Sequence, residues 1–154
     1  MAIESKTGLG GTISITADAP ASYDESGFTT LTFDKIEGVV SNGRTTGVSY
    51  GTTSFIDLET GETIENKTSI AAQEFTMMIP EDTTSTGREA LDAALASKDY
   101  VSFEIVNGAG NTKYFEAYVT GRTFEEGDTE NTEMASYTIK PRARDAVYVA
   151  ATTP

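Results

Sequence analysis

The chain contains no cysteine and no histidine among its 154 residues. These absences exclude disulfides, thiolate nucleophiles, imidazole general bases and the usual zinc ligands. Any reaction would therefore have to use carboxylate, lysine, tyrosine or serine side chains. The chain also has no tryptophan, so it lacks one common surface on which a sugar ring stacks.

Basic residues and long apolar runs are scarce as well. Eleven lysines and arginines stand against 24 acidic residues, which gives a formal net charge of −13. This charge opposes binding to nucleic acid phosphates and to anionic lipid. The apolar runs are too short for a signal peptide or a membrane-spanning helix. We therefore expect a soluble product, made in the cytoplasm, with no membrane partner.

Threonine is abundant, with 25 copies, and tyrosine and phenylalanine are spread along the chain. These residue types favour half-buried pleated surfaces over helices. The length suits one domain with an ordinary core. We predict a single, mainly β domain over residues 1–154.

Apolar residues that alternate with polar ones predict the strands. In chain order these strands lie at 12–17, 28–40, 70–80, 101–121 as a hairpin, 134–141 and 146–150. A slip of phase in the second strand predicts a bulge near Asp34. Asn107 and Gly108 predict a hairpin turn and not a phosphate loop, because they join two strands and precede no helix. The run 122–131 is predicted to be a polar loop.

One helix is predicted between these strands. Thr86 and Glu89 match a capping box, and a narrow stripe of alanine and leucine follows at helical spacing. A narrow stripe is typical of a helix that flanks a sheet. We therefore expect Arg88, Asp92 and Ser97 on its outer face.

Residues 41–67 form a long glycine- and threonine-rich connection with few large apolar side chains. Connections of this length in a compact domain are normally functional or disordered. Two interpretations are open, a mobile surface loop and a segment that becomes ordered on a neighbouring subunit. Within it, Asp57, Glu59 and Glu62 surround Gly61 and predict a solvated hairpin tip.

Carboxylates are the only plentiful chemical groups. The acidic run Glu125, Glu126, Asp128 and Glu130 offers oxygen ligands for calcium, but its spacing does not match an EF-hand. Glu104 and Glu116 lie opposite the apolar phase, where they could face each other like the acids of a glycosidase. No aromatic-rich cleft accompanies them. We predict no metal, no cofactor and no catalytic residue. An acid-catalysed hydrolase is a third hypothesis, which rests only on the number of carboxylates.

The order of elements resembles the major tail tube protein of long-tailed (siphovirus-type) bacteriophages. The resemblance rests on the early strand, the bent second strand, the long 41–67 segment and the run Phe75 to Pro80. The helix at 87–97, the hairpin at 101–121 and the closing strand at 133–141 complete it, over about residues 10–149. It implies a β-sandwich or partial barrel of two packed antiparallel sheets with one flanking helix. It also implies a structural virion protein that is not an enzyme.

The resemblance further implies an assembly. Six copies would join their sheet edges into a ring, and rings would stack into a tail tube that delivers DNA to the host without binding it specifically. Terminator, tape measure and tip proteins would be further partners, and no appended domain is expected. The 41–67 segment would reach a neighbouring subunit or ring. The candidate inter-subunit residues are Thr45, Thr46, Tyr50, Phe55, Ile56, Asp57, Leu58, Ile64, Arg142 and Arg144.

The acidic composition fits a conduit, because a negative lumen repels DNA. The lumen-facing candidates are the out-of-phase residues Glu74, Glu104, Glu116 and Glu133. Lys140, Arg142 and Arg144 are predicted either to pair with acidic groups of an adjacent subunit or to form a solvated chain end. The alternative function from another class is a monomeric β-sandwich binding module, for example for carbohydrate.

Overall fold

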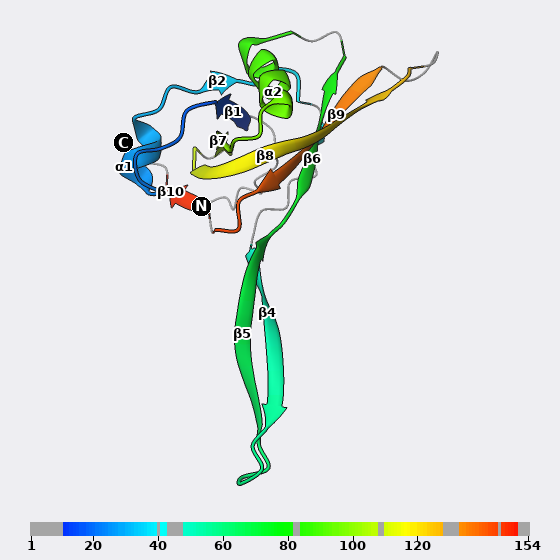
Figure 1. Ribbon diagram of the computed structural model, residues 1–154. Helices are drawn as coiled ribbons and strands as arrows, with labels where there is room; N and C mark the ends of the chain where they lie inside the picture. The colour runs from blue at the N-terminus through cyan, green and yellow to red at the C-terminus, as the bar shows by residue number, and fades with distance from the viewer. Residues whose placement is uncertain are drawn as a thin grey trace, which may run out of the picture.

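The chain folds into one curled antiparallel sheet from which a two-stranded hairpin projects (Figure 1). This computed structural model describes residues 11–39, 41–42, 48–81, 84–107, 110–127, 133–144 and 146–150. The helices are α1 (Glu25–Thr29) and α2 (Thr86–Ala96). The projecting hairpin consists of β4 (Val48–Ile56) and β5 (Thr63–Ala72). The main sheet contains β1 (Thr12–Thr16), β2 (Asp34–Lys35), β3 (Ser41–Asn42), β6 (Phe75–Pro80), β7 (Val101–Val106), β8 (Thr112–Glu125), β9 (Met134–Pro141) and β10 (Val147–Val149).

The main sheet has the strand order β2-β1-β7-β8-β9-β6-β3, and all its pairs are antiparallel. The strand β8 pairs with β7 along one edge, and with β10 and then β9 along the other. Its register with β9 shifts between Val119 and Gly121, and irregularities of this kind bend a strand and increase its twist. The mainly β, antiparallel class with a flanking helix is therefore confirmed.

The hydrophobic core lies between α2 and one face of the main sheet. On β6 the exposure alternates, with Phe75, Met77 and Ile79 buried, as expected for a strand that buries one face. Phe103 on β7 lies opposite Phe115 on β8, and their rings stack with centroids 5.4 Å apart. The other members of this core are Ile13, Ile15, Ile36, Leu91, Ala94, Val101, Ala117, Val119, Ala135, Tyr137 and Ile139.

The N-cap of helix α2 lies one residue before the predicted cap, Thr86. Ser85 is the N-cap, and its hydroxyl accepts a hydrogen bond from the Arg88 backbone N–H at 3.1 Å; the capping box predicted from Thr86 is wrong. Gly87 allows close packing, because a Cβ there would lie 2.3 Å from the Lys35 carbonyl oxygen. The predicted apolar stripe is confirmed, with Leu91 and Ala94 buried against the sheet.

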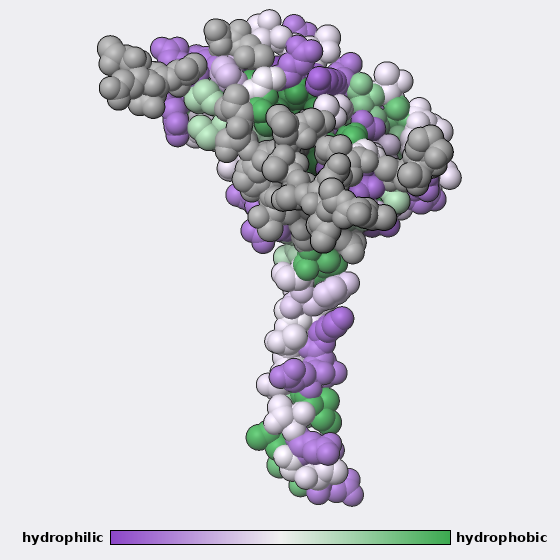
Figure 2. Space-filling view, turned by 180° about the vertical axis from the view of Figure 1, so that it is seen from behind, coloured by the Kyte–Doolittle hydropathy of each residue, from purple (hydrophilic) through white to green (hydrophobic). Residues whose placement is uncertain are grey.

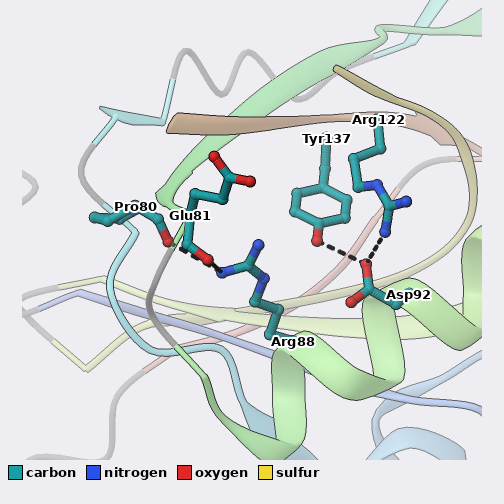
Figure 3. A network of polar contacts seen from close by, with 6 residues as sticks. All are labelled: Pro80, Glu81, Arg88, Asp92, Arg122 and Tyr137. Atoms are coloured by element: carbon teal, nitrogen blue, oxygen red, sulfur yellow. Dashed lines mark hydrogen bonds and ion pairs between the residues drawn. The ribbon is translucent and has the colours of Figure 1, made fainter. Parts of the chain in front are cut away.

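Polar side chains of α2 also contact the sheet, contrary to the prediction that they point outward (Figure 3). Asp92 accepts a hydrogen bond from the Tyr137 hydroxyl at 2.7 Å and forms an ion pair with Arg122 at 2.8 Å. The Arg88 guanidinium donates to the Pro80 carbonyl oxygen at 3.0 Å. These contacts attach the helix to β6, β8 and β9.

The second predicted strand, 28–40, is wrong over most of its length. Asp34 and Lys35 pair with β1, and the Ile36 N–H donates to the Ile13 carbonyl oxygen at 2.9 Å. The short helix α1 precedes them. Asp24 caps α1 by accepting from the Gly27 N–H at 2.8 Å. Phe28 is fully buried, and its ring stacks on Tyr114 with centroids 5.3 Å apart. Burial of this aromatic residue outside the main core explains why periodicity misled the prediction.

Two predicted loops also contain strands. The strand β8 continues to Glu125 and pairs with β9, so the first part of the 122–131 loop is strand. Much of the 41–67 connection is the β4–β5 hairpin, which extends to Ala72. The predicted solvated hairpin tip around Gly61 is confirmed. Residues 43–47, with Thr45 and Thr46, lie outside the described residues.

We predict that Phe103→Ala destabilises the subunit by about 3–5 kcal/mol, because it removes a fully buried ring from a paired stack. The check is the free energy of unfolding from urea titration. Phe124→Ala is the matched control, since that ring is 49% exposed, and it should cost about 1 kcal/mol or less. Equal stabilities for the two variants would contradict the assigned core.

Candidate assembly surfaces

The β4–β5 hairpin projects from the body of the molecule as a thin arm (Figure 1). In the described part of the chain its two strands hydrogen-bond only to each other as a separate sheet. The nine residues of β4 span about 30 Å at about 3.3 Å per residue. The arm therefore reaches well beyond the body.

The arm exposes large apolar side chains. Four of the six exposed large hydrophobic residues in the described part of the chain belong to it, namely Tyr50, Phe55, Ile56 and Leu58. Ile64 lies opposite Phe55 and is only partly covered. Figure 2 shows hydrophobic surface near the tip of the arm and again at its base, with polar surface between. An isolated hairpin is marginally stable in water, so this surface fits contact with another molecule.

The tip of the arm is a hydrogen-bonded turn. The Gly61 N–H donates to the Asp57 carbonyl oxygen at 2.7 Å, and the Asp57 N–H donates to the Glu62 carbonyl oxygen at 2.8 Å. The Asp57 carboxylate accepts a further bond from the Glu59 N–H at 2.8 Å. Gly61 has φ +73°, a conformation that glycine adopts without strain. This turn holds Leu58 97% exposed.

The distal part of the arm is also acidic. It carries Asp57, Glu59, Glu62 and Glu65, and no lysine or arginine lies between residues 48 and 66. The next basic residue is Lys67, whose ammonium lies 4.8 Å from the centre of the Tyr50 ring. A partner for the tip must therefore accommodate apolar side chains and negative charge together.

Both ends of the main sheet have a partly covered edge. On one side β2 pairs with β1 only through the registers of Ser14 and Ile15. On the other side β3 pairs with β6 only through Met77 and Met78. Beside β1, the Ile36 N–H also donates to the Ile13 carbonyl oxygen at 2.9 Å. In the described part of the chain, the remaining residues of β1 and β6 pair with no further strand on those sides. Such edges are templates for pairing with another chain.

The outer face of β7 and β8 carries a cluster that sequence reasoning missed. Glu116 is 8% exposed, and its carboxylate forms an ion pair with Arg142 at 2.9 Å. The Arg142 guanidinium also lies over the Tyr100 ring, which stacks on Tyr118 with centroids 3.9 Å apart. The nearby Glu116 carboxylate raises the pKa of Arg142 through this hydrogen bond.

This cluster bears on two predictions. Arg142 pairs with Glu116 of its own chain, and a contact of this side chain with an adjacent subunit stays a prediction. Glu116 is buried and neutralised by Arg142, so it supplies no open negative charge to a lumen. Arg144 lies over the Tyr23 ring at 4.0 Å. The separation of Glu116 and Arg142 along the chain explains why no local pattern revealed them.

The remaining acidic candidates are dispersed. Glu74 is exposed just before β6, whereas Glu133 is exposed at the opposite end of that strand, where its carbonyl oxygen accepts from the Glu81 N–H. Glu104 is half-buried and lies opposite Tyr114, whereas Glu116 lies opposite Ser102. Glu104 and Glu116 are therefore not a directly facing acid pair.

The acidic run that was weighed as a calcium site, 125–130, is only partly described, because Asp128 and Glu130 lie outside the described residues. Within the described ranges, no group of three or more acidic residues is arranged to hold a metal ion. No helix in those ranges is long and apolar enough to cross a membrane.

Comparison with solved structures identifies the fold. A chain in the baseplate of the anti-feeding prophage superposes with a TM-score of 0.67 at 7% identity, covering 97% of this chain and 98% of that one. The SPP1 tail tube protein gives a TM-score of 0.62 at 13% identity, over 97% of this chain and 81% of that one. The chain has the fold of a tail tube subunit.

The same fold occurs in the virion of a native gene transfer agent particle, with a TM-score of 0.64 at 11% identity, over 95% of this chain and 100% of that one. Sequence comparison adds nothing to this, since no family model and no curated protein matches the chain. The tail-tube resemblance read from the order of elements is thus confirmed at the level of the fold.

We predict an alkaline loss of stability that depends on Tyr114. Burial and the neighbouring Glu104 carboxylate raise the pKa of Tyr114 from 10.0 to about 12. The unfolded chain therefore releases this proton at a lower pH than the folded chain, and the contribution to stability is complete below pH 10 and lost between 10 and about 12. Urea titrations across this window should show a shallower decline for Tyr114→Phe than for the wild type. Tyr148→Phe, on an exposed residue, is the control, and equal slopes for both variants would contradict the assignment.

Proposed function

We propose that this protein is a structural subunit that assembles into rings, which stack into a phage-type tail tube. The observation that carries the proposal is the arm, an exposed apolar-tipped hairpin on a tail-tube fold. A monomeric binding module has no evident use for such an arm. The proposed location is the tail of a virion, and the proposed role is that of a conduit and not of an enzyme.

The open sheet edges support the ring. The uncovered parts of β1 and β6 lie at opposite ends of the strand order, so one edge of a subunit can meet the other edge of its neighbour. Such a head-to-tail contact closes into a ring when the rotation allows it. Six copies are proposed, because the baseplate of the anti-feeding prophage was treated with 6-fold symmetry and the gene transfer agent tail with C6 symmetry.

The charge of the chain supports the conduit. A formal charge of −13 per subunit repels duplex DNA, whereas each basic contact to a phosphate would retard it. Glu74, Glu104 and Glu133 stay proposals for the lumen. Glu116 is no longer proposed, because its charge is offset by the ion pair with Arg142. Terminator, tape measure and tip proteins are proposed as the partners that start and end the tube.

The direct test is the size of the purified protein as its concentration rises. A tube subunit should give rings or long polymers in negative-stain micrographs and in sedimentation, with a central channel. A strictly monomeric 16.4 kDa species at every concentration would favour the binding module and reject the proposal.

We predict that assembly depends on the arm and folding does not. Replacing residues 52–67 with a short glycine-serine link removes the distal arm, which contributes no residue to the buried core. The variant should melt within a few degrees of the wild type, since its core is intact, and should stay monomeric. Thr53→Ser, a polar change midway along the arm, is the control and should still form tubes. Normal tubes from the shortened protein would rule out the arm as an assembly element.

We also predict that charge reversal in the lumen slows DNA. Glu74→Lys and Glu133→Lys replace exposed carboxylates, and each change is repeated in every ring. Tubes assembled with linear duplex DNA should then retain it at low salt and release it at high salt. Glu37→Lys, on the exposed segment beside α2, is the control. DNA retention no greater than in the control would place both side chains away from the channel.

A further inference from the structure

A pocket lies at the base of the arm, where β5 meets the main sheet. Its volume is about 360 Å³, within the range of sites that enclose a ligand or several side chains. One wall is the end of β5, with Ile70, Ala71 and Ala72. The facing wall comprises Tyr100, Tyr118, Lys140, Pro141 and Ala143.

The walls of the pocket are apolar and held in place. The stacked rings of Tyr100 and Tyr118 are 3.9 Å apart, and the guanidinium of Arg142, itself fixed by Glu116, lies over the Tyr100 ring at 5.4 Å. A wall ordered in advance loses little conformational entropy when a side chain enters. This order favours a specific occupant over loose hydrophobic contact.

The rim of the pocket is basic. Lys140 is exposed and has no acidic partner in the described part of the chain. Lys140 is the basic residue of the pocket lining, since the charge of Arg142 on the following segment is offset by Glu116. The pocket therefore offers apolar walls together with positive charge, which complements the apolar and acidic tip of the arm.

We propose that this pocket receives the arm tip of a second copy of this chain, with Leu58 inserted and the tip carboxylates near Lys140. The inference rests on the proposed function and names the acceptor site for the arm. The tip cannot fill the pocket of its own chain, because the strands of the arm hold it about 30 Å away. Each copy thus donates one tip and offers one pocket, so the contact repeats from copy to copy along a tube.

The absence of cysteine permits a clean cross-linking test. A Leu58→Cys variant is mixed with an Ala143→Cys variant that carries a size tag, and the mixture is concentrated and oxidised. The expected product is a disulfide-linked dimer of one chain of each kind, formed at tube-forming concentration and lost on prior dilution. Thr53→Cys, midway along the arm, mixed with the same Ala143→Cys partner is the matched control and should cross-link at least about tenfold less.

The outcomes separate the two proposals. Tubes without cross-linking above the Thr53→Cys control would overturn the pocket assignment and leave the tube function intact. Dimers of Leu58→Cys with itself would also overturn it, since they report contact between tips. Wild-type protein that forms no polymer would overturn both.

Filling the pocket gives a second readout. Ala143→Trp places a large ring in the pocket. Because Ala143 is exposed, folding should be unaffected and the melting temperature unchanged. The concentration needed for tubes should rise by roughly tenfold or more, the change expected when a well-packed anchor is excluded. Ala93→Trp, on the exposed side of α2, is the control. Equal tube formation by the two variants would show that the arm tip docks elsewhere.

Discussion

The pairing of β8 with three other strands is the constraint on which the rest of the structure depends. Because side chains alternate along a strand, one face of β8 gives Phe115, Ala117 and Val119 to the core. Its other face gives Glu116 and Tyr118 to the ion pair and the pocket wall. A shift of register by one residue would exchange the two sets. Core stability and the geometry of the assembly surfaces are therefore set by the same hydrogen bonds.

The arm differs from the body, because it cannot bury its own apolar side chains. Two strands have no second layer against which to bury side chains, so Phe55, Ile56 and Leu58 stay in water in the isolated subunit. The carboxylates around the tip repel those of other tips, which disfavours tip-to-tip pairing. The negative charge near the apolar tip thus disfavours association of free subunits through their tips. It still allows the tip to bind a surface that is basic and apolar. A self-sufficient body and an incomplete arm together describe a component built for assembly.

Local signals account for the predictions that the structure confirms. The hairpin of β7 and β8 was visible because Val101, Phe103 and Phe115 alternate around a turn, and α2 because its alanine and leucine stripe follows helical spacing. The arm gives no strand signal in the sequence, because a hairpin exposed on both faces shows no apolar alternation. The strand predicted at 28–40 is wrong for a related reason. Phe28 belongs to the short helix α1, and its ring is buried on Tyr114 at the outer face of the sheet.

By itself, the sequence determined the chemistry that this protein lacks, its strong negative charge and its mainly β class, because these follow from composition and short-range periodicity. Only the tertiary structure decided that Asp92 meets Arg122 and Tyr137, and that Glu116 meets Arg142. These partners lie 26 to 45 residues apart, and their contact depends on the register of several strands at once. The pocket has the same origin, because it exists only where the base of β5 reaches the outer face of β8 and β9.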